Sequence, residues 1–183
     1  MITFLKVGIN LAQILGELHA QKIIHKDIKP HNILINPESF EVKLIDFSIS
    51  SRLDQENPTL SNPNLLEGTL AYMSPEQTGR MNRVCDYRTD LYSLGVTLYE
   101  MLTGTLPFDA IDPMELIHCH IAKMPAAPCQ ETVCRVLEDV PEAISAIILK
   151  LLAINSRESV SKRLGTESGF RGMLVSPSSE WQD

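Results

Sequence analysis

A short loop and a nearby aspartate carry the residue types best suited to chemistry in this 183-residue chain. Asp27, Lys29 and Asn32 lie close together, and Asp46 follows further along the chain. A carboxylate can accept a proton, an ammonium group can neutralise an anion, and carboxylate and amide oxygens suit hard divalent cations. Taken alone, an aspartate, a lysine and an asparagine at this spacing most often form a capped turn.

Short strands are predicted on either side of these residues. β-Branched runs lie at 23–24, 33–35 and 42–45, and turn-forming residues separate the last two. The first group therefore lies between two strands, and Asp46 directly follows a third. Residues 48–68 are polar and rich in turn formers, which predicts a long surface loop.

Apolar residues at helical spacing account for most of the remaining chain. They predict helices over 3–20, 89–103 and 112–122, and another that begins at 141. Asp112 is the expected N-cap of the third helix, and Gly104 is expected to end the second. The predicted fold class is mostly α with a small β element beside a cluster of loops.

Four motifs, in order, resemble the protein kinase superfamily. The loop from His25 to Asn32 is similar to the catalytic loop HRDxKxxN, and 46–48 is similar to the DFG motif. GTLAYMSPE at 68–76 resembles the end of the activation loop, and DLYSLG at 90–95 resembles the start of the central helix. The resemblance covers about residues 3–158. It implies the C-terminal lobe of a Ser/Thr protein kinase.

The resemblance implies phosphoryl transfer to a protein hydroxyl, with three catalytic residues. Asp27 would accept or orient the proton of the substrate hydroxyl. Lys29 would lie near the transferred phosphoryl group as a positive charge, and its position two residues after the aspartate resembles Ser/Thr rather than Tyr kinases. Thr69 would bridge Asp27 and Lys29 by hydrogen bonds.

ATP and Mg²⁺ are the cofactors that the resemblance implies. Asn32 and Asp46 would hold the metal through oxygen ligands, which suit a cation that bridges phosphates. The same two residues, with Leu34, are the expected nucleotide-binding residues.

Four further motif residues are expected to hold the fold. His25 and Phe47 should pack together, and Asp90 should accept hydrogen bonds from backbone N–H groups of the catalytic loop. Glu76 would pair with an arginine late in the lobe, as it does in the family.

Two substitutions depart from the family pattern within its motifs. Lys26 replaces the arginine of HRD, which keeps the charge and loses the planar guanidinium. Ser48 replaces the glycine of DFG and narrows the backbone freedom beside the expected metal ligand. Residues 78–83 resemble the kinase module at the front of large bacterial signalling proteins that end in a histidine kinase.

The two ends of the chain also differ from the family. The sequence opens at what resembles the first long helix of the lower lobe, so we expect the upper, N-terminal lobe to be absent and turnover by this chain alone to be weak. We interpret residues 1–158 as the C-lobe and 159–183 as an aberrant, poorly ordered tail, for which a one-base frameshift is our hypothesis. Arg157 or Arg163 would then have to replace the arginine partner of Glu76.

Composition and charge exclude several other classes. The formal net charge of −7 disfavours nucleic acid and anionic membrane surfaces as partners. No apolar run of bilayer length and no leader are found, which favours a cytoplasmic protein. His118, Cys119 and His120, near Cys129 and Cys134, are imaginable zinc ligands, but their spacing fits no usual zinc motif.

Two classes of function therefore remain open. The first is a Ser/Thr protein kinase of bacterial signal transduction, present as a C-lobe fragment. The second is a catalytically inactive, pseudokinase-like interaction module or gene fragment. The expected partners are a protein substrate and a separate N-lobe or further signalling domains, with neither nucleic acid nor a membrane.

Overall fold

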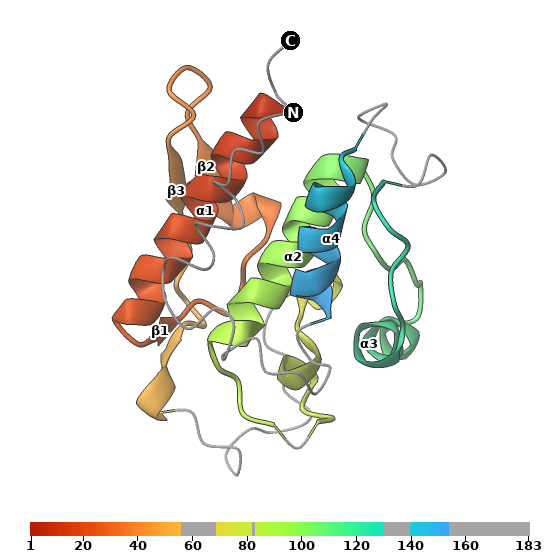
Figure 1. Ribbon diagram of the computed structural model, residues 1–183. Helices are drawn as coiled ribbons and strands as arrows, with labels where there is room; N and C mark the ends of the chain where they lie inside the picture. Colours follow the sequence, from red (N-terminus) through yellow and green to blue (C-terminus); the bar gives the residue numbers. More distant parts are fainter. Residues whose placement is uncertain (56–68, 82, 130–139, 154–183) are drawn as a thin grey trace.

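The computed structural model describes residues 1–55, 69–81, 83–129 and 140–153 (Figure 1). These residues form a mostly helical fold with two small sheets, which confirms the predicted fold class. The helices are α1 (Ile2–Ala20), α2 (Tyr87–Thr103), α3 (Pro113–Ala122) and α4 (Glu142–Leu152). The strands are β1 (Ile23–Ile24), β2 (Ile33–Ile35), β3 (Val42–Leu44) and β4 (Ser51–Arg52). The predicted tail, 159–183, lies outside the described residues.

Helix α2 is the centre of the core. It lies between α1 and α4 in Figure 1, and most of its residues are buried, as expected of a helix with neighbours on several sides. Leu11 and Leu15 of α1 and Leu151 of α4 belong to the same buried cluster as Leu94 of α2. Burial of each such leucine contributes about 1.5–3 kcal/mol, so this cluster is the main support of the fold.

The ends of α2 are set by local hydrogen bonding and by glycine. The Asp86 side chain accepts a hydrogen bond from Arg88 N at 2.8 Å, so the helix begins at Tyr87, two residues before the predicted start. Gly104 adopts φ 74°, a left-handed conformation that glycine reaches without a Cβ clash. The predicted end at Gly104 is therefore confirmed.

Both sheets are antiparallel pairs. Strands β2 and β3 form a hairpin with Ile33 opposite Leu44, and β1 pairs with β4 through Ile24 and Ser51. Strand β4 falls within 48–68, which the sequence predicts as loop. A two-residue strand is too short to show an alternating pattern, so the pairing with β1 left no sequence signal.

The described residues include four short 3₁₀ helices: η1 (Pro30–Asn32), η2 (Leu53–Gln55), η3 (Leu70–Tyr72) and η4 (Pro75–Thr78). Helices η3 and η4 contact both α2 and α3. Segment 69–78 is thereby held against the helical core. Among the described residues, no helix is long and apolar enough to cross a bilayer.

Candidate active site

The catalytic loop is anchored to α2 through Asp90. The side chain of Asp90 is fully buried, and its two oxygens accept hydrogen bonds from His25 N at 2.9 Å and Lys26 N at 2.8 Å. This confirms the predicted contact. His19 Nε2 lies 2.9 Å from Asp90 Oδ2, so α1 shares the same carboxylate, a contact that the sequence did not indicate. A buried carboxylate with three partners fixes the loop against two helices.

Two residues of the loop cluster adopt left-handed backbone conformations. Lys26 has φ 69° and Asp46 has φ 65°. Each such non-glycine residue costs on the order of 1 kcal/mol, and such residues persist where their surroundings fix them. One directly precedes Asp27 and the other is itself a predicted metal ligand. The other two non-glycine residues with positive φ among the described residues, Lys22 and Phe40, lie between α1 and β1 and between β2 and β3.

Asp27 is the centre of a small hydrogen-bonded cluster. Lys29 Nζ donates to Asp27 Oδ2 at 2.6 Å, and Asn32 Nδ2 donates to the same oxygen at 2.9 Å. Asn32 Nδ2 also donates to the backbone oxygen of Asp27 at 2.8 Å. The side chain of Asp27 is 10% exposed, so one carboxylate receives two donors while it remains reachable from solvent.

Thr69 joins the end of the activation segment to this cluster. Its Oγ1 lies 2.7 Å from Lys29 Nζ and 3.5 Å from Asp27 Oδ1. Lys29 Nζ therefore lies between the carboxylate of Asp27 and the hydroxyl of Thr69. The structure brings these three predicted residues together from positions 40 residues apart in sequence.

Asn32 and Asp46 lie at the ends of paired strands. Ile45 N donates to the backbone oxygen of Asn32 at 2.9 Å, which continues the β2–β3 pairing to the residue just before Asp46. The two donations from Asn32 Nδ2 fix its amide orientation, because both partners are acceptors. Its Oδ1 makes no hydrogen bond among the described residues, so this oxygen is of the type that a hard cation would take.

Ser48 lowers the pKa of the neighbouring Asp46 carboxyl group. Hydrogen bonds from the Ser48 hydroxyl and backbone N–H hold the pKa of Asp46 below its ordinary value, and the charge of Lys29 acts in the same direction. Ser48 N lies 3.3 Å from Asp46 Oδ1. An exposed carboxylate and an amide oxygen are ligand types that fit Mg²⁺, which keeps several waters and uses only one or two protein carboxylates.

The described residues offer no alternative metal centre. No group of three or more histidine, cysteine, aspartate and glutamate side chains among them could hold an ion. Cys119 and His120 are buried on α3, whereas His118 is exposed, so the three do not converge. His120 Nδ1 lies 2.8 Å from the hydroxyl of Tyr92. Cys134, the other imagined zinc ligand, lies outside the described residues.

His25 and Phe47 pack ring to ring, as predicted. Their centroids are 4.6 Å apart with an interplanar angle of 64°. Asp27 N donates to His25 Nδ1 at 3.3 Å, so Nε2 carries the proton and donates to Ile45 O at 3.2 Å. Burial lowers the pKa of His25, which favours this neutral form.

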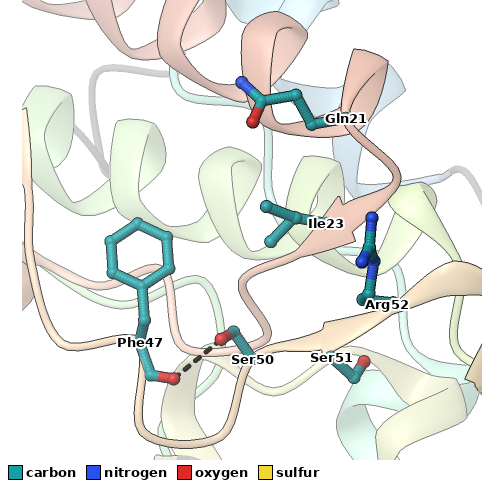
Figure 2. Close-up of a pocket in the computed structure, with 6 residues that line it drawn as sticks. All are labelled: Gln21, Ile23, Phe47, Ser50, Ser51 and Arg52. Atoms are coloured by element: carbon teal, nitrogen blue, oxygen red, sulfur yellow. Dashed lines mark hydrogen bonds between the residues drawn. The ribbon is translucent and has the colours of Figure 1, made fainter.

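The outer side of Phe47 borders an open pocket of about 580 Å³ (Figure 2). Figure 2 shows the phenyl ring at one side and Ile23 and Arg52 across from it, with Ser50 donating to the Phe47 carbonyl at 2.7 Å. Phe47 is 42% exposed, and Leu34 on β2 is 53% exposed. Leu34 lies on β2 opposite Lys43 of β3, with its side chain open to solvent.

Glu76 is a buried residue of η4, within segment 69–78. Its Oε1 accepts a hydrogen bond from Thr89 Oγ1 at 2.8 Å. Its Oε2 is buried and has no hydrogen-bond partner among the described residues. Arg157 and Arg163, the candidate partners from sequence, lie outside the described residues.

Comparison with known proteins agrees with this geometry. The family model for the protein kinase domain matches residues 6–171. The chain is 36% identical, over 81% of its length, to the "Probable serine/threonine-protein kinase CPE1738" of Clostridium perfringens. It is 34% identical, over 89% of its length, to the serine/threonine-protein kinase PknB of Mycolicibacterium smegmatis. It is 31% identical, over 82% of its length, to hybrid signal transduction histidine kinase G of Dictyostelium discoideum.

The fold is also similar to that of a solved kinase. The Cydia pomonella granulovirus kinase PK-1 superposes with a TM-score of 0.68 at 23% identity, covering 94% of this chain and 58% of that one. The chain therefore belongs to the protein kinase family, and the bacterial relatives that it matches include serine/threonine kinases. It spans 20% of the length of the Clostridium perfringens relative, 24% of the Mycolicibacterium smegmatis one and 6% of the Dictyostelium one.

Proposed function

We propose that this chain provides the catalytic surface for Mg²⁺-dependent transfer of the ATP γ-phosphoryl group to serine or threonine hydroxyls of a protein, in signal transduction. The observation that carries this proposal is the contact of Lys29 Nζ with both Asp27 Oδ2 and Thr69 Oγ1. A carboxylate and an ammonium group at this separation can serve the acceptor hydroxyl and the transferred phosphoryl group together.

In this proposal, the residues of the site have separate roles. Asp27 accepts or orients the proton of the substrate hydroxyl, and its hydrogen bonds from Lys29 and Asn32 hold the carboxylate in one orientation. Lys29 stabilises negative charge that develops on the transferred group. Asn32 and Asp46 would hold Mg²⁺, which supplies charge neutralisation to the phosphates when bound.

A nucleotide bound at this site would need a second protein surface over it, and the described residues do not provide that surface. Leu34, Ile35, Ile45 and Phe47 are 53%, 42%, 38% and 42% exposed, and they lie on or just after β2 and β3. Large apolar side chains left exposed on or beside two paired strands can be covered by another body. We propose that a kinase N-lobe or another signalling domain covers this apolar surface, with Leu34 against the nucleotide.

The same surface favours a second candidate, a non-catalytic interaction module. In that case the apolar side chains would bind a partner without any phosphoryl transfer. The two candidates differ in one measurable property, which is transfer that depends on Asp27.

The test is transfer of labelled γ-phosphoryl from ATP to a basic protein substrate in the presence of Mg²⁺. We expect transfer by the wild type and its loss in Asp27→Asn, which removes the negative charge and keeps the shape. Asp109→Asn, at an exposed aspartate, is the matched control and should retain transfer. No transfer by the wild type, together with no thermal shift on adding Mg²⁺-ATP, would contradict the enzyme and favour the interaction module.

A further inference from the structure

The side chain of Gln77 on η4 forms a bridge between two distant segments. Its Oε1 accepts a hydrogen bond from Ser74 N at 3.0 Å, and its Nε2 donates to the backbone oxygen of Lys26 at 2.8 Å. The orientation of the amide is fixed, because one partner is a donor and the other an acceptor. The link spans 51 residues of sequence and is partly buried.

The Lys26 end of this bridge is a strained position. Lys26 has φ 69°, and its N–H is already held by Asp90 Oδ1 at 2.8 Å. Gln77 holds the carbonyl of the same residue, so both polar groups of its backbone are fixed. A peptide bond is planar, and the Lys26 carbonyl shares its plane with the N–H of Asp27. Gln77 therefore helps to set the backbone orientation at which Asp27 begins.

Segment 69–78 is tied to the catalytic loop at both of its ends. Thr69 makes the first link, through Lys29 Nζ at 2.7 Å. Gln77 makes the second, through Lys26. Between the two links, Tyr72 O accepts a hydrogen bond from Ser93 Oγ of α2 at 2.8 Å, which holds the middle of the segment to the core.

We propose that Gln77 is a positioning residue that couples segment 69–78 to the catalytic loop, so that Asp27 and this segment hold one relative geometry. The inference rests on the proposed function for its catalytic consequence. The coupling itself rests only on the two hydrogen bonds and the backbone of Lys26. Ser74 and Gln77 match the Ser-x-x-Gln pattern of a capping box, which accounts for the bond from Ser74 N and not for the bond to Lys26 O.

Two variants distinguish the two hydrogen bonds of Gln77, one with Ser74 N and the other with Lys26 O. Gln77→Glu keeps an oxygen acceptor for Ser74 N and replaces the donor to Lys26 O with an oxygen that repels it. Gln77→Ala removes both bonds. Gln13→Glu, at an exposed glutamine of α1, makes the same change of charge away from the loop and is the matched control.

Amide hydrogen exchange of the full chain is the first readout. In Gln77→Glu we expect exchange at Asp27 N–H to rise about tenfold, as loss of one hydrogen bond permits, with exchange at Ser74 N–H unchanged. In Gln77→Ala we expect both to rise, while amides in the middle of α2 stay protected and show that the fold is intact. Unchanged exchange at Asp27 in both variants would overturn the proposal.

Steady-state transfer is the second readout. We expect kcat to fall about tenfold in Gln77→Glu with KM for ATP nearly unchanged, because orientation and not nucleotide binding is affected. If kcat/KM falls as much only because KM for ATP rises, with kcat unchanged, the catalytic consequence proposed for Gln77 is wrong. If the wild type shows no transfer but the exchange pattern is as expected, the proposed function fails and the coupling by Gln77 stands.

Discussion

The backbone carbonyl of Asn32 accepts a hydrogen bond from the N–H of Ile45 at 2.9 Å. This bond extends the pairing of β2 with β3 by one residue at the open end of the hairpin. The sheet therefore fixes the position of Asn32 relative to Ile45. Asn32 itself and Asp46, the residue after Ile45, are the two proposed metal ligands. A hairpin is a rigid way to hold two ligands whose spacing in sequence gives no fixed distance.

Thr69 should act through its hydroxyl. Thr69→Val keeps the shape and removes the oxygen that lies 2.7 Å from Lys29 Nζ, so Lys29 would lose one of its two partners. We expect kcat for phosphoryl transfer to fall about tenfold, in line with loss of a charged hydrogen bond. Thr69→Ser keeps the hydroxyl and should retain most activity. Equal activity in the valine and serine variants would show that the contact has no catalytic role.

Ser48 should set the acid limit of activity. Its hydroxyl is the main cause that holds the pKa of Asp46 below the ordinary aspartate value. In Ser48→Ala this pKa should rise, so the carboxylate becomes protonated at a higher pH and the acid limb of the pH–rate profile moves upward. A carbon-detected NMR titration of the Asp46 carboxyl group measures the shift directly. A profile and a titration that match the wild type would contradict the role given to Ser48.

The sequence, through its family resemblance, carried the elements of the site and part of its cross-links, among them the contacts of Thr69 with Lys29 and of Asp90 with the catalytic loop. Asp27, Lys29 and Asn32 are close in sequence, and their motif is recognisable because one loop must hold all three.

Ser48 and Gln77 were missed as contributors for a physical reason. The contact of Gln77 with Ser74 N follows a capping-box pattern that the sequence does carry. The contact of Gln77 with Lys26 and those of Ser48 depend on loop conformations that hydrophobic periodicity does not encode.

The helices were predicted well because each has a buried face. The start of α2 was predicted two residues too late, because the N-cap Asp86 lies before the first apolar residue of the pattern. Strand β4 was missed, since two residues that pair with a distant strand carry no period. The first error lies at the end of an element, where a single hydrogen bond decides the boundary. The second is a whole strand that depends on a partner distant in sequence.

Gly95 should be required for the contact of α2 with α4. A Cβ built at Gly95 would lie 2.8 Å from Leu151 Cβ, closer than the two helices allow without moving apart. We expect Gly95→Ala to lower the free energy of unfolding by about 1–3 kcal/mol, measured by urea titration. Gly16→Ala on α1, where a Cβ would meet nothing within 4 Å, should instead stabilise by about 0.5–1 kcal/mol. If Gly95→Ala leaves the free energy of unfolding unchanged, α2 and α4 can move apart without loss of stability and the close contact is not required.

His120 should make the fold sensitive to acid. Burial lowers the pKa of His120 from 6.5 to about 4, and the nearby Leu70 carbonyl opposes this only in part, because Nε2 has no hydrogen-bond partner among the described residues. The folded protein therefore keeps this ring neutral where the unfolded chain binds a proton. Stability is fully present above pH 6.5 and falls as the pH drops toward 4, by up to roughly 3 kcal/mol.

The contribution of His120 can be separated from that of other histidines. His25 also has a lowered pKa through burial, so acid should destabilise the protein at both positions. His120→Gln offers an oxygen to the hydroxyl of Tyr92 and cannot be protonated in this range, so the loss of stability between pH 6.5 and 4 should shrink. His118→Gln, at an exposed position of the same helix, should leave that loss unchanged. If both variants lose stability with pH as the wild type does, the neutral ring of His120 is not the source of the acid sensitivity.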